Sequence, residues 1–153
     1  DESIDILNWA LEQNDPDRLK DEDQALAERL MTQNDGPFKA ALDRYKYPNR
    51  FPDEDCSSAR DDGLAILQEL DGLLARNNGF LASEKLSRAD IAIFPFIRQF
   101  AHVDRDWFYD LPLKNLQNWL GKRLESSLFK AIMSKYNQWE PDAEPVYFGH
   151  SEP

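Results

Sequence analysis

The sequence contains one cysteine, Cys56, and two histidines, His102 and His150. A single cysteine cannot form an internal disulfide, and the acidic run at 53–55 beside it disfavours the thiolate that a nucleophile needs. Neither histidine has a second histidine or a cysteine at metal-ligand spacing. The sequence therefore predicts no metal site and no cysteine nucleophile, and a lone thiol is typical of a reduced, cytosolic protein.

Long apolar runs and basic side chains are scarce as well. No stretch of about 18 apolar residues is present to span a bilayer, and the first residues lack the basic and then apolar pattern of a secretory signal. The chain has 18 lysines and arginines against 29 aspartates and glutamates, a formal net charge of −11. Because nucleic acids and many membrane surfaces are anionic, neither is an expected partner, and we expect a cytoplasmic location.

The motifs of familiar active sites are also missing. There is no glycine-rich phosphate loop, no nucleophile elbow and no His-Glu-x-x-His segment. No segment alternates convincingly between apolar and polar residues, so no strand is predicted. Carboxylates are abundant, but nothing in the sequence pairs two of them for acid–base work. The residues of this chain alone therefore assign no catalytic group.

Helical periodicity is what the chain does have. Its 153 residues are 41% hydrophobic and 31% charged, which is typical of one soluble domain with a real core. Apolar residues recur at spacings of three and four in seven segments, about 4–14, 19–31, 38–45, 59–76, 88–103, 113–124 and 127–136. We expect an all-α fold, a helical bundle with mostly short connections.

The predicted helix near the middle of the chain is apolar on almost every side, which indicates that other helices surround it. Ser87 and Asp90 at its start form the pattern Ser-x-x-acid, a capping box in which each side chain bonds to the backbone N–H of the other residue. Leu86 and Ile91 flank the box as a hydrophobic staple. We expect Ser87 and Asp90 to act as a structural cap, worth about 0.5–2 kcal/mol, and not as catalytic residues.

This capped, buried helix in an all-helical bundle resembles the carboxy-terminal domain of the glutathione transferases. The order of the predicted helices resembles that family from residue 1 to 139, and the segment 38–48 resembles bacterial members. The resemblance implies that 1–15 is the last helix of an otherwise absent thioredoxin-like domain, that 16–140 is the all-helical domain, and that 141–153 is an acidic, proline-containing tail. The chain starts with Asp and not Met, so we expect it to be a piece of a longer protein.

The resemblance also implies ligands and site residues. In this family a Glu/Gln-Ser pair at a helix start holds the γ-glutamyl end of glutathione, and Glu2 and Ser3 match it. Free N–H groups and a hydroxyl suit the glutamyl carboxylate, and the Glu2 carboxylate suits the ammonium group beside it. Phe38, Tyr45 and Trp139 correspond to positions that line the pocket for a small apolar electrophile. The family needs no metal, and a homodimer is left open.

The missing thioredoxin-like half carries the family's catalytic residue, so the chain alone is expected to be inactive. Three functions for the parent protein remain open. In the first, the parent protein is a glutathione transferase. In the second, it is a glutathione-dependent thiol oxidoreductase of the glutaredoxin type on the same scaffold. In the third, catalysis has been lost and the bundle is a protein-interaction module. We favour the transferase.

Overall fold

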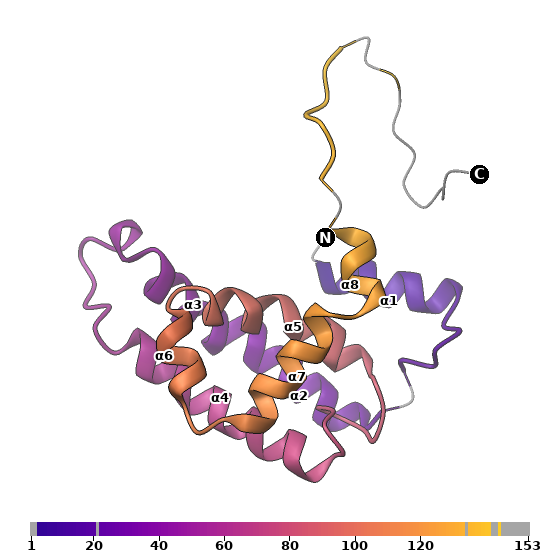
Figure 1. The fold of residues 1–153 in the computed structure, drawn as a ribbon, viewed down its shortest axis with the longest axis horizontal. Coiled ribbons are helices and arrows are strands. Elements are labelled where there is room, and N and C mark those ends of the chain that lie inside the picture. Colours follow the sequence, from indigo (N-terminus) through magenta and orange to yellow (C-terminus); the bar gives the residue numbers. More distant parts are fainter. Residues whose placement is uncertain (1–2, 21, 134, 142–143, 145–153) are drawn as a thin grey trace.

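The computed structural model describes residues 3–20, 22–133, 135–141 and 144, and within these ranges it contains helices and no strand (Figure 1). The elements are α1 Ser3–Gln13, α2 Gln24–Gln33, a π-helical turn Asn34–Phe38, α3 Lys39–Lys46, a 3-10 turn Pro48–Arg50, α4 Ala59–Arg76, α5 Arg88–Ala101, α6 Arg105–Asp110, α7 Lys114–Leu124 and α8 Ser127–Ile132. None of these helices is long and apolar enough to cross a bilayer. The predicted all-α fold class is confirmed.

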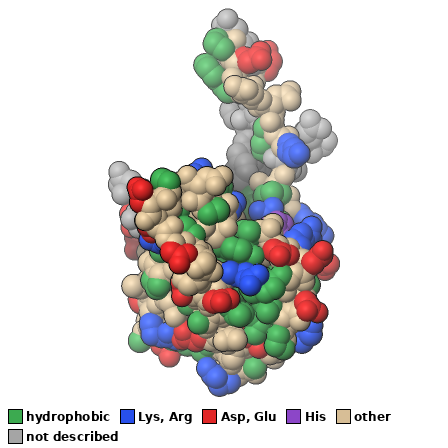
Figure 2. Space-filling view, turned by 90° about the vertical axis from the view of Figure 1, so that its left-hand side faces the viewer, with side chains coloured by type: hydrophobic (Ala, Val, Ile, Leu, Met, Phe, Trp, Pro, Cys, Tyr) green, Lys and Arg blue, Asp and Glu red, His purple; other side chains and the backbone are tan. Residues whose placement is uncertain are grey.

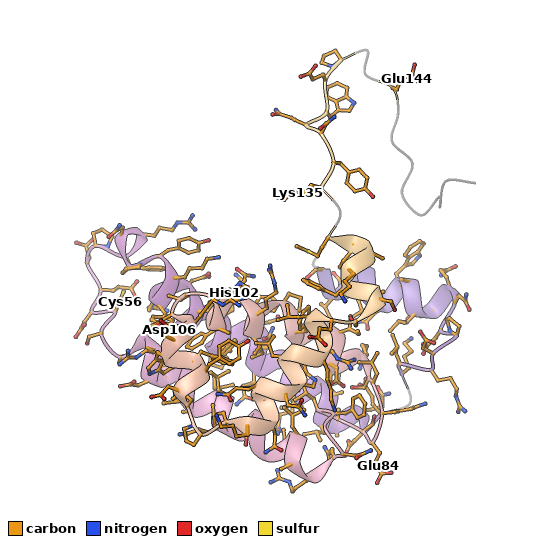
Figure 3. All side chains as sticks on the ribbon, viewed as in Figure 1. Cys56, Glu84, His102, Asp106, Lys135 and Glu144 are labelled. Carbon is orange, nitrogen blue, oxygen red and sulfur yellow. The ribbon has the colours of Figure 1, made fainter. Side chains whose placement is uncertain are left out.

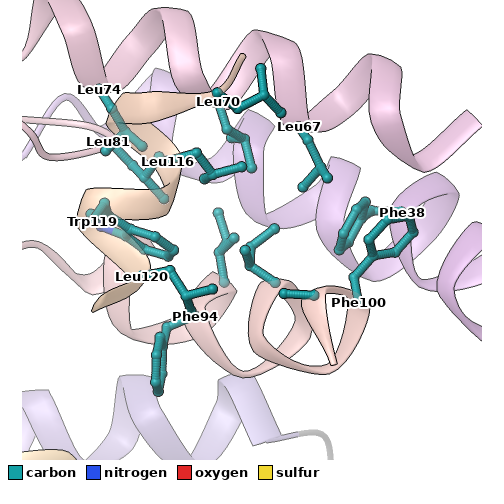
Figure 4. Close-up of a cluster of buried hydrophobic side chains, with 14 of the residues drawn as sticks. Phe38, Leu67, Leu70, Leu74, Leu81, Phe94, Phe100, Leu116, Trp119 and Leu120 are labelled. Carbon is teal, nitrogen blue, oxygen red and sulfur yellow. The ribbon is translucent and has the colours of Figure 1, made fainter. Parts of the chain in front are cut away.

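The core surrounds α5, as the sequence predicts. This helix packs against α2, α3 and α7, while α4 lies against α3 and α7 and closes the bundle. Figure 4 shows the contacts between side chains of these helices. The largest fully buried side chains include Phe38, Leu67, Leu74, Leu81, Phe100, Leu116, Trp119 and Leu120.

The first turn of α5 is fixed from inside by a buried carboxylate. Ser87 and Asp90 form the capping box, with the Ser87 N–H donating to Asp90 Oδ2 at 3.1 Å and the Ser87 hydroxyl donating to the same oxygen at 2.6 Å. Asp90 Oδ1 accepts from Trp119 Nε1 at 2.7 Å and from the Leu81 N–H at 3.2 Å. Burial raises the pKa of Asp90, although these four donors favour the ionised form. The carboxylate therefore joins α5 to α7 and to the preceding connection.

The same turn carries a buried arginine whose partners lie on the other side of α5. Arg88 donates from Nε to Glu22 at 2.9 Å, from Nη2 to Glu28 at 2.7 Å and from Nη1 to Asn8 at 2.8 Å. The Arg88 side chain is 6% exposed and that of Glu22 is 0% exposed. Glu22 also accepts from the Ala89 N–H at 3.2 Å. These bonds connect α1, α2 and the chain between them to α5.

The second predicted helix begins later than the sequence suggests. Its expected range starts near Leu19, whereas α2 starts at Gln24, because the Asp23 carboxylate caps it by accepting from the Leu26 N–H at 3.0 Å. The carboxylate of Asp15 accepts from the Leu19 N–H at 2.7 Å and holds the chain ahead of α2 in a turn. Both carboxylates accept hydrogen bonds from backbone N–H groups that would otherwise bond within a helix. The spacing of apolar residues does not reveal such bonds.

The last predicted helix is shorter than expected. Its range reached residue 136, whereas α8 ends at Ile132. Residues 135–140 form no regular structure and extend away from the bundle (Figure 1). The large side chains of Tyr136 and Trp139 in this segment are exposed. The spacing of Tyr136 and Trp139 therefore suggested a longer helix, but neither side chain packs against the bundle.

A glycine of α4 allows close packing with α5, and we expect its replacement to be unfavourable. A Cβ added to Gly63 would lie 2.3 Å from Cε2 of Phe100, a ring that is fully buried. Although Gly→Ala inside a helix normally stabilises by up to about 1 kcal/mol, Gly63→Ala should destabilise the protein by about 1–3 kcal/mol because of overpacking. Urea unfolding midpoints measure the change.

Gly72 in the same helix provides the matched control. The nearest atom to a Cβ added there is Nη1 of Arg76 at 3.5 Å, the end of a flexible side chain. Gly72→Ala should therefore raise the midpoint while Gly63→Ala lowers it. Equal stabilisation by both substitutions would contradict the close packing of α4 on α5.

Candidate functional site

Two apolar cavities flank the side of α5 that the other helices leave partly open. The α1 cavity, of about 360 Å³, lies between α1, α2, the π turn and α5. The α8 cavity, of about 330 Å³, lies between α5, α8 and the end of α7. Ile91 and Pro95 line both cavities, so one exposed stripe of α5 separates them. Both volumes fall within the size range of small-molecule sites, about 300–1,000 Å³.

The α1 cavity combines an apolar wall with a polar rim. Its lining residues are Ser3, Ile4, Leu7, Met31, Asn34, Asp35, Ile91, Ala92, Pro95 and Phe96. Asn34 is only 4% exposed; its amide nitrogen donates to Asp35 Oδ1 at 3.1 Å, and its Oδ1 has no partner among the described residues. Buried polar atoms are normally hydrogen-bonded. The α1 cavity therefore combines an apolar wall with a rim that contains a buried acceptor without a partner among the described residues.

The polar rim comes from a π-helical turn. Pro37 has no backbone N–H to continue the ladder of bonds to the residue four positions back. The helix widens there, so that the Lys39 N–H donates to the Asn34 carbonyl five residues back. The residues at 34–37 predict a turn, whereas the family resemblance predicts one long, interrupted helix. The structure shows the interrupted helix, because α2 and α3 join through the π turn. Such turns are rare and frequently occur at functional sites.

Of the two residues matched to glutathione binding, Ser3 is the first residue of α1 and lines the α1 cavity, and Glu2 lies outside the described residues. α1 has no buried side chain, and Ile6 and Trp9 on it are more than 60% exposed. An apolar helix face without cover is typical of an element that normally packs against another part of a protein.

The three residues matched to the electrophile pocket do not meet. Phe38 is buried in the core, where its ring lies 5.3 Å from that of Phe100. Tyr45 is half-buried and packs on the same ring at 5.0 Å, and burial together with the nearby Asp104 raises its pKa. Trp139 is 78% exposed beyond α8. Neither Tyr45 nor Trp139 lines either large cavity.

The structure draws attention to two residues of α5 to which the sequence assigned no role in a site. Pro95 and Phe96 form part of the α1 cavity although the helix that contains them was expected to be surrounded on every side. Pro95 is exposed and Phe96 half-buried. The interior Pro95 predicts a bend in this helix and not a cavity, because a proline removes one backbone bond and its ring crowds the preceding turn.

Among the described residues, the thiol of Cys56 and the imidazole of His102 do not form a reactive pair, and His150 lies outside these residues. Figure 3 shows Cys56 in the loop ahead of α4 and His102 at the end of α5, apart from each other. Partial burial and the nearby charges of Arg98 and Arg105 lower the pKa of His102, which favours its neutral form. No three His, Cys, Asp or Glu side chains are grouped to hold a metal ion in the described part of the chain. Figure 2 shows acidic and basic side chains interspersed with apolar ones on the face of the molecule that it presents.

Comparison with known proteins identifies one family. The family model described as the glutathione S-transferase, C-terminal domain matches residues 23–122, which run from the start of α2 to near the end of α7. No curated protein matches the chain. No solved structure matches it either.

Proposed function

Since the chain belongs to the glutathione S-transferase C-terminal domain family, we propose that it supplies the apolar electrophile pocket of a glutathione transferase. The supporting observation is the α1 cavity, which has Ser3 at its rim and apolar side chains of α5 along its wall. Ser3 is one of the two residues that the family resemblance assigns to the γ-glutamyl end of glutathione. An apolar electrophile in this cavity would lie on the same side of α5 as that residue.

The proposed reaction is attack of the glutathione thiolate on the electrophile, with loss of its leaving group. The cavity would contribute by holding the electrophile in place and excluding water, because positioning two reactants lowers the entropic part of the barrier. Forming the thiolate at neutral pH needs a hydrogen-bond donor or a positive charge aimed at the sulfur. We assign that group to the thioredoxin-like half, so the chain itself should not catalyse the reaction.

Phe38, Tyr45 and Trp139 remain part of the proposal, in different ways. Tyr45 is half-buried at the end of α3 and can reach a ligand at its exposed edge. Phe38 would act by supporting the ring of Phe100, on which Tyr45 packs. Trp139 lies on the segment after α8 and would have to move onto the bundle to contribute.

The test of the proposed function compares this chain with the same chain joined to a thioredoxin-like half. For the chain alone, calorimetry should detect no binding of glutathione and an assay with a chromogenic aryl halide should detect no conjugation. Contacts from Glu2 and Ser3 alone do not offset the several kcal/mol, on the order of 4–15, that association costs. The longer protein should conjugate. Turnover by the chain alone would contradict the proposal. Silence of the longer protein would instead favour the oxidoreductase or the interaction module.

A pair of substitutions in the longer protein tests which residues form the wall. Phe96→Ala should raise the KM for apolar electrophiles roughly fivefold, by removing part of an aromatic contact, and leave the KM for glutathione unchanged. Tyr45→Ala is the matched test of the wall expected from the sequence, and it should raise the KM for apolar electrophiles more than the KM for glutathione. Steady-state kinetics in which the concentrations of both substrates are varied measure the two KM values. An equal rise in both KM values for Phe96→Ala would remove this residue from the electrophile wall.

A further inference from the structure

The turn that follows α4 contains Asn78 and Gly79, and no other asparagine in the chain is followed by glycine. Asn78 is exposed to solvent. Asparagine is one of the chemically labile residues of proteins, because its side-chain amide can react with the backbone nitrogen of the next residue. Glycine has no Cβ to shield that nitrogen. The pair therefore brings the two groups of this reaction together at the surface.

The backbone of this turn ends α4 in a Schellman motif. Asn78 has a φ of +54°, in the left-handed region, and Gly79 follows with a φ of +86°. The Gly79 N–H donates to the Leu74 carbonyl, five residues back, at 2.8 Å. Asparagine is, after glycine, the residue that most often takes the left-handed position of such a motif. The fold therefore uses Asn78 to end a helix and holds the nitrogen that would attack its side chain.

The preceding residue, Asn77, offers a comparison within the same turn. Its side-chain amide donates to the Leu81 carbonyl at 3.0 Å, which holds the group in place. The residue after it is Asn78, whose Cβ crowds the backbone nitrogen that would have to attack. Asn77 therefore lacks both features that expose the side chain of Asn78 to reaction.

We propose that Asn78 is a site of spontaneous deamidation and that opening of the last turn of α4 controls the rate. The Gly79 nitrogen forms a bond to Cγ of Asn78, the bond between Cγ and the side-chain nitrogen breaks, and ammonia leaves with the proton that the Gly79 N–H gives up. Water then opens the resulting five-membered succinimide at either carbonyl. The products are aspartate or isoaspartate at position 78, and no group is oxidised or reduced.

The hydrogen bond of Gly79 explains why opening of the turn should control the rate. The nitrogen must leave the Leu74 carbonyl and turn towards the Asn78 side chain before it can attack. Helix ends open at a lower free-energy cost than the core of a domain. The folded protein should therefore deamidate at Asn78, but more slowly than the unfolded chain.

The two products should affect the fold differently. Aspartate keeps the backbone unchanged, and its carboxylate would line the cavity of about 250 Å³ that Asn78 shares with Lys122. Isoaspartate adds a methylene group to the backbone, so the turn cannot keep its hydrogen-bond geometry. The chain continues from this turn to Leu81, whose N–H donates to the buried carboxylate of Asp90 at 3.2 Å. Isoaspartate should therefore loosen the connection that supports the start of α5.

The test is incubation of the protein at mildly alkaline pH, followed by tryptic digestion and mass spectrometry. Cleavage after Arg76 and Lys85 releases residues 77–85, so both asparagines lie in one peptide. Electron-transfer fragmentation locates the change and separates isoaspartate from aspartate, and a sample digested without incubation gives the background. Conversion is expected at Asn78 and not at Asn77. Urea should accelerate it about tenfold or more, the factor for an opening that costs at least about 1.4 kcal/mol.

Asn78→Gly is the matched control, because glycine suits the left-handed position and has no side-chain amide to lose. This variant should show no conversion of the peptide, and its urea unfolding midpoint should equal or exceed that of the parent. Asn78→Asp supplies the aspartate product alone. Hydrogen exchange at the Leu81 amide should stay as slow in Asn78→Asp as in the fresh parent, and become faster in incubated protein that contains isoaspartate.

Three results would overturn the proposal. Conversion of Asn77 as fast as that of Asn78 would show that the turn does not select the site. Equal rates in the folded protein and in urea would show that opening of the turn does not control the reaction. Conversion in urea alone would show that the folded protein is protected.

Discussion

Asp90→Ala should lower the free energy of unfolding by about 4 kcal/mol, more than an ordinary cap contributes. The carboxylate is fully buried and accepts from Ser87, Leu81 and Trp119 through four donors. Alanine would leave all of them without a partner, and each unsatisfied buried donor costs about 1–3 kcal/mol before relaxation. The capping box alone predicts about 0.5–2 kcal/mol.

Urea unfolding followed by circular dichroism measures this effect. Asp104→Ala is the matched control, because Asp104 caps α6 with a single exposed bond to the Trp107 N–H at 3.0 Å and should cost only about 1 kcal/mol. Asp90→Asn should fall between the two, since the amide oxygen can still accept from Trp119 while the amide nitrogen faces other donors. If Asp90→Ala costs no more than Asp104→Ala, the bonds from Trp119 and Leu81 add nothing to the cap.

The second large effect is expected at Arg88, whose replacement by alanine should cost about 3–5 kcal/mol. The substitution leaves the Glu22 carboxylate buried, with the Ala89 N–H as its remaining partner among the described residues. Removing one member of a buried ion pair is costly for this reason. It also removes the bonds to Asn8 and Glu28, so α1 and the start of α2 should loosen first.

A surface ion pair and a double substitution serve as controls. Arg29 pairs with Glu69 at 2.7 Å with its side chain 50% exposed, so Arg29→Ala should cost at most about 1 kcal/mol. Replacing Arg88 by methionine and Glu22 by glutamine together should cost less than Arg88→Ala, because no charge is left buried. A double variant that is less stable than Arg88→Ala would contradict this account of the pair.

The parts of the fold that are predictable from the sequence depend on residues close together in the chain. The Ser87 to Asp90 spacing predicts the cap, and the leucine pattern of 59–76 predicts α4 with the observed bounds. The partners of the first turn of α5 could not be predicted in this way. Trp119 lies 29 positions from Asp90 and Glu22 lies 66 positions from Arg88, so their contacts exist only once the bundle has formed.

In the candidate site, too, the sequence indicates features that depend on neighbouring residues and not those that depend on how the helices pack. The residue pair at the helix start singled out Ser3, which lines the α1 cavity, and its role in binding glutathione stays a prediction. Pro95 and Phe96 were not predictable as cavity residues, because apolar periodicity does not say which side of a central helix its neighbours leave open.

The opposite directions in which Asp90 and Arg88 point have a consequence for local motions of the protein. Opening the α7 side of the bundle would expose the bonds of Asp90, and opening the α1 and α2 side would break those of Arg88, although both residues belong to one helical turn. A partial opening on either side therefore disturbs the start of the helix that supports the other. The amide hydrogens of Leu81, Ser87 and Ala89, which donate to these buried carboxylates, should then exchange with solvent only in the same rare event. The bundle would behave as one cooperative unit centred on this turn, while α8, which has no buried side chain, remains free to adjust to what binds beside it.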